Sequence, residues 1–166
     1  MMEGLGSDSP DAFVRNLRAE LDAFRDFHEL LLTEQSVLAA GDADALVELS
    51  RRKSEQVTRL TQLTDARNRY LNSATGLTDQ SGIDAWQAKF DPQRRIGTDR
   101  LWQSLLDLAR SAKQLNEQNG LLINLKLQHN QQALAVLRGV AAQTTQLYGP
   151  DGQSYSAAHG RPLGKA

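Results

Sequence analysis

Apolar residues recur at spacings of three and four along most of this chain, and this pattern constrains its fold more than any other feature. In the first segment they form heptads, which bury one stripe of a helix against partner helices. The stripe consists of Val14, Leu17, Leu21, Phe24, Leu31 and Leu38, with His28 and Gln35 at the intervening positions. Further apolar residues widen it, namely Phe13, Phe27, Leu30 and Leu32. A stripe of this width favours a helical bundle over a two-stranded coiled coil.

Helix-capping residues mark the ends of the first two helices. In the stretch SDSP (7–10), the first three side chains can accept a hydrogen bond from a free backbone N–H, and Pro10 suits the first helical turn. Gly41 and Asp42 then end one helix and cap the next. We expect helices over about 10–40 and 43–71. An acidic helix joined by such a short turn to a mildly basic one indicates an antiparallel hairpin.

The rest of the helical sequence is longer than this hairpin. A short helix over 83–90 is expected to cap one end of the bundle, and a long helix over 93–147 follows. At 1.5 Å per residue the long helix would reach roughly 80 Å, whereas each of the first two would cover only about 45 Å. Its apolar stripe also shifts by one residue at Ile123, close to Gly120. Part of this helix must therefore overhang the hairpin, bend, or find another partner.

These patterns predict an all-α fold, an antiparallel helical bundle or coiled-coil hairpin with a long, bent or protruding C-terminal helix. Residues 1–147 are expected to form a single domain. Residues 148–166 contain too few apolar side chains to offset the entropy of ordering the chain. We expect them to form a flexible, disordered tail.

Composition limits the classes of function. The chain has 166 residues, 19 basic and 20 acidic side chains and no cysteine. A net charge of -1 provides no overall field to attract nucleic acid or anionic lipid, and the lack of cysteine excludes disulfides and thiolate sites. The N-terminus has no signal-peptide pattern, and no apolar stretch of about 18 residues suggests membrane insertion. We expect a cytoplasmic protein.

Signals of catalysis and of metal or cofactor binding are weak. His28 has no carboxylate or histidine three or four residues on, so it is better explained as a polar residue of the apolar stripe. His129 and His159 are scattered and form no zinc pattern. Common nucleotide-binding and nucleophile motifs do not occur. We therefore predict no enzyme activity, no cofactor and no metal. The basic run 51–53 is interpreted as a solvated, salt-bridged face rather than a nucleic-acid site.

The long helix contains an amide-rich stretch, QLNEQNGLLINLKLQHNQQALAVL. Its amides can bond to an incoming backbone or to each other, although a helix whose polar face is simply rich in amides explains them too. Gly120 costs about 1 kcal/mol relative to alanine inside a helix. Next to Leu121, Leu122 and Ile123 it would create a flat apolar site that another helix can approach closely.

This stretch and the sequence after it resemble the FlgN family of flagellar type III export chaperones. The matching elements are Leu115-Asn116, Asn119-Gly120, Asn130-Gln131-Gln132-Ala133-Leu134, Leu147-Tyr148-Gly149 and Asp151-Gly152-Gln153. The detailed match covers roughly a quarter of the chain, and Pro150 is a variation within the last motif.

The resemblance implies a small helical cytoplasmic chaperone that binds the C-terminal helices of the hook–filament junction proteins FlgK and FlgL and delivers them to the export gate. It places client binding between Asn119 and Leu137, and gate contact, to the cytosolic domain of FlhA, at Tyr148. Together with the apolar stripe that outlasts the hairpin, it predicts these client-binding residues: Asn119, Gly120, Leu122, Ile123, Leu127, Asn130, Leu134 and Leu137. The alternative is a structural coiled-coil homodimer or adaptor whose long helix pairs with its own copy.

Overall fold

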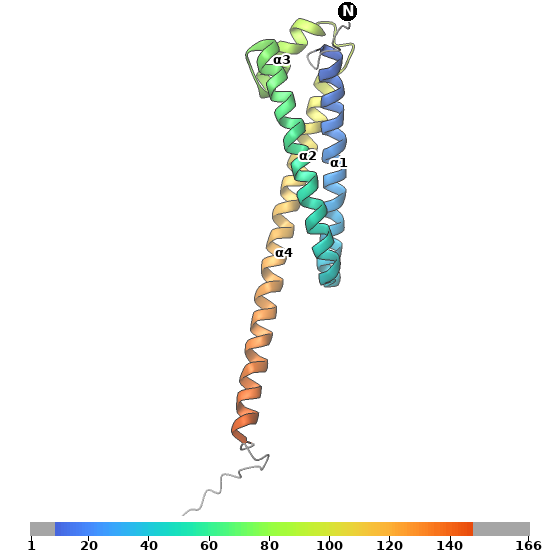
Figure 1. Cartoon of the computed structure of the whole chain (residues 1–166). Helices are drawn as coiled ribbons and strands as arrows, with labels where there is room; N and C mark the ends of the chain where they lie inside the picture. Colours follow the sequence, from blue (N-terminus) through green and yellow to red (C-terminus); the bar gives the residue numbers. More distant parts are fainter. Residues whose placement is uncertain (1–8, 148–166) are drawn as a thin grey trace, which may run out of the picture. The chain divides into compact units, whose positions relative to one another are not determined.

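The computed structural model describes residues 9–147, with side chains through residue 143, and this part of the chain is built of α-helices and their connections. The helices are α1 (Pro10–Ala40), α2 (Ala43–Thr75), α3 (Asp79–Phe90) and α4 (Thr98–Leu147), in the order shown in Figure 1. The prediction of an all-α helical bundle is confirmed. None of the described helices is long and apolar enough to cross a membrane.

The caps of the hairpin lie where the sequence places them. Ser9 is the N-cap of α1, and its Oγ accepts a hydrogen bond from the backbone N–H of Ala12 at 3.1 Å. Gly41 takes the left-handed conformation with φ 75°, which ends α1. Asp42 then caps α2 by accepting from the backbone N–H of Ala45 at 3.0 Å. Local side-chain chemistry therefore sets the short turn between α1 and α2.

The ends of the other helices differ from the predicted ones. α2 continues past residue 71 to Thr75, because the helix ends only where Gly76 adopts φ 74°. α3 starts earlier than residue 83, at Asp79. Its first turn includes Gly82, where an added Cβ would lie 2.9 Å from the carbonyl oxygen of Leu77, so only glycine fits there without a shift.

α4 begins at Thr98 rather than at residue 93. The carboxylate of Asp91 accepts hydrogen bonds from the backbone N–H groups of Arg95, at 2.8 Å, and Ile96, at 3.0 Å. Gly97 adopts φ 74°, which also departs from helical geometry. These bonds and this conformation hold residues 91–97 as a loop, so the predicted start at residue 93 is five residues too early.

Two ion pairs fix the register of the hairpin, in which α1 and α2 lie side by side (Figure 1). Arg67 Nη1 lies 2.5 Å from Glu20 Oε1, and Lys53 Nζ lies 2.9 Å from Glu34 Oε2. Glu34 follows Glu20 by two heptads on α1, whereas Lys53 precedes Arg67 by two heptads on α2. The two helices are therefore antiparallel, as the sequence predicts.

The core consists of two connected layers. At the α3 end, aromatic rings pack together among aliphatic side chains: Trp86 is fully buried, with its ring centroid 4.8 Å from that of Phe13 and 5.5 Å from that of Phe90. The second layer joins three helices through Ala23, Phe27, Leu31, Leu60, Ala112 and Leu115. This arrangement agrees with the expected short helix that caps the bundle. Leu32 is an exception to the predicted stripe, since it is 46% exposed: the buried arc of α1 extends from Leu31 toward Leu30 on the other side.

The chain divides into two compact units, Met1–Leu122 and Ile123–Ala166. The division falls between Leu122 and Ile123, where the apolar stripe of the long helix shifts by one residue. The helical assignment of α4 continues through this point. That residues 1–147 act as one domain stays a prediction, and the expected tail, 148–166, lies outside the described residues.

Candidate partner-binding surface on α4

In the first unit, α4 contributes a buried stripe to the bundle. Trp102 and Leu105 are each 3% exposed, and Ala112 and Leu115 are 1% and 8% exposed. Their spacing of three, seven and three residues places them on one face of the helix. Trp102 also donates from Nε1 to Gln80 Oε1 at 2.7 Å, and its ring lies 4.8 Å from the guanidinium carbon of Arg67. This part of α4 already has its packing partners.

Asn119 is the last anchored residue of this stripe. Its side chain is fully buried, and Nδ2 donates to the carbonyl oxygen of Leu31 at 2.8 Å and to Glu34 Oε2 at 2.9 Å. Glu34 in turn accepts from Lys53, so Asn119 belongs to a polar cluster that joins α1, α2 and α4. Client contact by Asn119 stays a prediction, and it requires a side chain that is fully buried here to become accessible.

The next predicted site residues are only partly covered. Gly120, Leu122 and Ile123 are half-buried. An added Cβ at Gly120 would meet no atom within 4 Å, so packing within the described chain does not require glycine there. The structure therefore leaves open the space into which the sequence predicts that another helix approaches.

The described part of the second unit, residues 123–147, presents an exposed apolar stripe. Leu127 and Leu134 are each 53% exposed and Leu137 is 64% exposed. Asn130 is exposed and lies between them at the same three- and four-residue spacing. We call Leu127, Asn130, Leu134 and Leu137 the α4 stripe. All side chains from residue 127 to residue 143 are exposed.

The charges of this segment have one sign. Between residues 123 and 147 the sequence contains Lys126 and Arg138 and no aspartate or glutamate. The stripe is therefore flanked by basic side chains and amides, which suits an apolar surface that is complemented by neutral or acidic groups on a partner.

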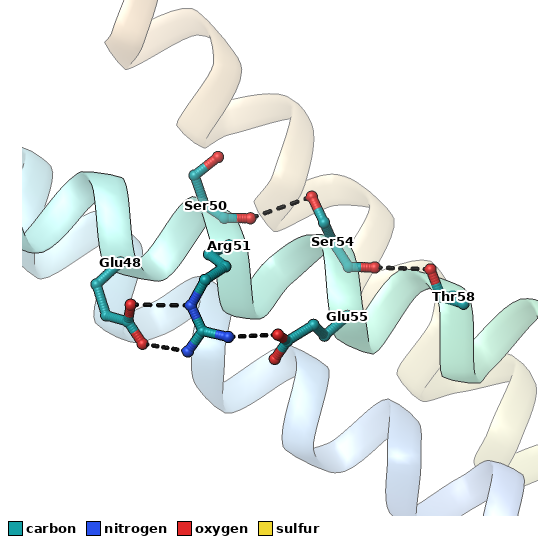
Figure 2. Close-up of polar contacts among 6 residues, drawn as sticks. All are labelled: Glu48, Ser50, Arg51, Ser54, Glu55 and Thr58. Carbon is teal, nitrogen blue, oxygen red and sulfur yellow. Dashed lines mark hydrogen bonds and ion pairs between the residues drawn. The ribbon is translucent and has the colours of Figure 1, made fainter.

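The basic run on α2 has partners within its own bundle. Figure 2 shows Arg51 between Glu48 and Glu55, with Arg51 Nη2 2.6 Å from Glu48 Oε1. The hydrogen bond from Arg51 lowers the pKa of Glu48, and the same bond raises the pKa of Arg51. In the same view, Ser54 Oγ donates to the carbonyl oxygen of Ser50 and Thr58 Oγ1 to that of Ser54. Arg51 therefore forms the exposed salt bridges that the sequence predicts for residues 51–53, whereas half-buried Lys53 pairs with Glu34 of α1.

His28 and His129, the histidines within the described residues, belong to no shared metal site. His28 Nε2 is 2.9 Å from Ser111 Oγ, so it links α1 to α4 as a polar residue of the buried stripe. His129 is exposed on α4, and His159 lies outside the described residues. Residues 9–147 contain no group of three or more side chains arranged to hold a metal ion.

A polar network inside the bundle is the feature that the sequence reading missed. Glu20 is fully buried; Arg67 and Thr64 donate to its Oε1, while Oε2 has no hydrogen-bond partner among the described residues. The pKa of Glu20 is raised overall, because burial raises it more than the nearby Arg67 guanidinium lowers it. The sequence contained a signal, because Glu20 and Glu34 lie beside the α1 stripe fourteen residues apart, and their partners Arg67 and Lys53 have the same separation on α2.

Comparison with known proteins bears on the identity of this bundle. The family model described as FlgN protein matches residues 1–156. The chain belongs to the FlgN family. A flagella synthesis protein FlgN of Yersinia enterocolitica is 31% identical over 152 residues, which covers 90% of this chain and 94% of the relative. Its counterpart in Proteus mirabilis is 28% identical over 150 residues, covering 84% and 88%. No solved structure matches the chain significantly.

Family membership extends the resemblance seen near the C-terminus to nearly the whole chain. The relatives are named as flagella synthesis proteins, which supports a role in flagellar synthesis, and FlgN is not a known enzyme family. Tyr148, the predicted gate contact, lies within the matched range but outside the described residues.

Proposed function

We propose that this chain is a cytoplasmic export chaperone for flagellar synthesis, whose α4 stripe binds the C-terminal helices of the hook-associated proteins FlgK and FlgL. Binding would keep these helices from associating early and would carry them to the type III export gate. The observation that carries the proposal is the exposure of Leu127, Leu134 and Leu137 on one face of α4, each more than half exposed.

This stripe fits the binding of a helix. Leucines at three- and four-residue spacing form the apolar face that an amphipathic partner helix covers. Full burial of one leucine side chain is worth about 1.5–3 kcal/mol. Asn130 within the stripe can hydrogen-bond to a polar group of the client and so fix its register, as single polar residues do in coiled coils. No nucleotide is needed, since release can come from competition at the gate.

The first experiment measures the affinity of a labelled peptide from the FlgK C-terminus by fluorescence anisotropy. In Leu134→Gln/Leu137→Gln the peptide should bind at least about tenfold more weakly, because the apolar surface that the two leucines would bury against the peptide is lost. Glutamine keeps a good helix propensity, so α4 should stay helical.

A matched control is available in the first unit. Leu32 and Leu77 are each 46% exposed, and Leu32→Gln/Leu77→Gln changes the same residue types away from α4. This control should bind the peptide like the parent chain. Equal affinity of the parent and the α4 variant would show that the stripe does not hold the client.

Gate delivery is proposed to depend on Tyr148. The variant Tyr148→Ala should bind the FlgK peptide normally and retain less of the FlhA cytosolic domain in a pull-down. Tyr70→Phe is a suitable tyrosine control within the bundle. If Tyr148→Ala retains as much FlhA as the parent chain, the assignment of gate contact to this residue is wrong.

A structural homodimer is the second candidate, and the same heptad spacing from Ile123 to Leu137 favours it. In this case two copies of the α4 stripe would cover each other. Sedimentation of the client-free protein distinguishes the candidates: a tight dimer that Leu134→Gln/Leu137→Gln dissociates, and that FlgK peptide does not compete with, supports the homodimer.

A further inference from the structure

Five arginines line one groove of about 470 Å³ in the first unit. They come from three parts of the chain: Arg18 and Arg25 from α1, Arg94 and Arg95 from the loop before α4, and Arg100 from the first turn of α4. All five side chains are exposed. The chain as a whole has a net charge of -1, so overall composition does not explain this concentration. We call it the arginine groove.

The loop that carries two of these arginines has a defined shape. Both oxygens of the buried Asp91 carboxylate accept backbone N–H groups of the loop, from Arg95 and Ile96. Arg94 adopts φ 53°, a left-handed conformation that is uncommon for arginine. The backbone therefore fixes where Arg94 and Arg95 start, so their placement beside the arginines of α1 is set by the fold.

Only two of the five arginines in the groove form ion pairs within the described part of the chain. Arg25 pairs with Asp22 at 2.7 Å and Arg94 with Asp99 at 3.3 Å, and both pairs are solvent-exposed. Exposed pairs contribute little to stability. Arg18, Arg95 and Arg100 form no ion pair with any other residue between 9 and 147. By contrast, the buried Arg67 is paired with Glu20. Folding alone thus gives no reason to gather these like charges.

We propose that the arginine groove docks an acidic segment of a partner protein, in which carboxylates flank an aliphatic side chain. Guanidinium groups bind carboxylates through two parallel N–H donors, and here the basic side chains in the groove are arginines without a lysine. Half-buried Ile96 and Leu101 also line the groove and offer an apolar contact between the charges. This proposal does not depend on the function of the α4 stripe.

Other anionic partners fit the groove less well. Its lining contains no aromatic side chain on which a base could stack. Its apolar members are buried or half-buried, Leu21 being only 5% exposed, so none can insert into a lipid surface. A protein segment uses both the carboxylate-binding donors and the apolar floor.

The test uses a short fluorescein-labelled peptide with glutamate pairs around single leucines, measured by anisotropy on the full chain. In Arg18→Gln/Arg95→Gln/Arg100→Gln its affinity should fall by about tenfold or more, because complementary charge pairs at the docking site are lost. In the charge-matched control Arg52→Gln/Arg69→Gln/Arg110→Gln, with three exposed arginines elsewhere, affinity should stay within about twofold. Circular dichroism should show unchanged helix content in both.

Three outcomes would overturn the proposal. Equal losses in the groove variant and the control would mean that only net charge matters. Equal binding of a peptide with glutamine in place of glutamate would remove the role of the carboxylates. Tighter groove-dependent binding of a single-stranded oligonucleotide, or of phosphatidylglycerol vesicles, than of the peptide would assign the groove to a different class of partner. FlgK peptide binding should be unchanged in the groove variant, which separates this result from the test of the α4 stripe.

Discussion

The two parts of α4 on either side of Leu122 have similar sequences and opposite environments. Before this point Leu105 and Leu115 are 3% and 8% exposed, whereas beyond it Leu134 and Leu137 are 53% and 64% exposed. Both sets of leucines follow three- and four-residue spacing on one helix. The comparison teaches that periodicity specifies a helix with an apolar face, while the distant residues available to cover that face decide whether it becomes core or surface.

Polar residues within the two stripes differ in the same way. Asn119 is fully buried and donates to the carbonyl oxygen of Leu31 and to Glu34, whereas Asn130 is exposed. An amide in the first part is thus a fixed structural link, and an amide in the second is accessible to a partner. Matched substitutions in the two parts can break or sharpen this contrast.

The largest difference in the free energy of unfolding is expected between matched leucine substitutions in the two parts of α4. Leu105→Ala should lower the free energy of unfolding by about 2–5 kcal/mol, because it removes buried side-chain contacts and leaves a cavity. Leu134→Ala should change it by no more than about 0.5 kcal/mol, as exposed sites do. Urea unfolding followed by circular dichroism measures both values. A large loss in Leu134→Ala would mean that this leucine is covered in solution, for example by a second copy of the chain.

The two asparagine variants should differ less in their free energy of unfolding than the two leucine variants do. Asn119→Ala should cost about 1–3 kcal/mol of unfolding free energy, since Glu34 and the Leu31 carbonyl lose a buried donor. Asn130→Ala should have little effect on stability and should weaken FlgK peptide binding if the α4 stripe holds the client. Urea titration and peptide anisotropy on both variants give the four values. If Asn119→Ala is as stable as Asn130→Ala, the buried link is energetically unimportant.

The effect of a Gly→Ala substitution on the free energy of unfolding should change sign with the space available for the new Cβ. Gly120→Ala should raise the free energy of unfolding by about 1 kcal/mol, because alanine is the better helix former and its Cβ meets no atom within 4 Å. Gly82→Ala should lower it, since the new Cβ would lie 2.9 Å from the Leu77 carbonyl oxygen. Thermal unfolding of the two variants is the measurement. Stabilisation by Gly82→Ala would contradict the close packing of α3 on the end of α2.

The smallest effect is a pH dependence from Glu20. Burial raises the pKa of this carboxyl group in the folded state, so its stabilising protonation is complete at low pH and is lost as pH rises through the raised pKa. The melting temperature of the parent chain should therefore fall relative to that of Glu20→Gln as pH increases through this range. Glu117→Gln, at an exposed position of α4, is the control and should follow the parent. If the melting temperatures of all three proteins change with pH in parallel, the pKa of Glu20 is not raised in the folded state.

Much of the hairpin could be predicted from local sequence because local chemistry specifies it. Ser9, Gly41 and Asp42 form the caps that their residue types indicate, and the phase shift at Ile123 coincides with the division between the two units. The start of α4 was predicted five residues too early, although its loop is held by the same kind of local chemistry, the Asp91 carboxylate and the left-handed Gly97. Pro92 also suits the first turn of a helix, so the residue types alone point to an earlier start.

The sequence by itself determined the helices, their apolar stripes and the family, since these depend on residue spacing and on motifs close together in the chain. Only the tertiary structure decided the partners of individual polar residues: Glu20 with Arg67, and Glu34 with Lys53 and Asn119. It alone brought Arg18 beside Arg95 and Arg100 in one groove. The physical reason is that burial and ion pairing depend on residues far apart in sequence, whose approach is set by the packing of whole helices.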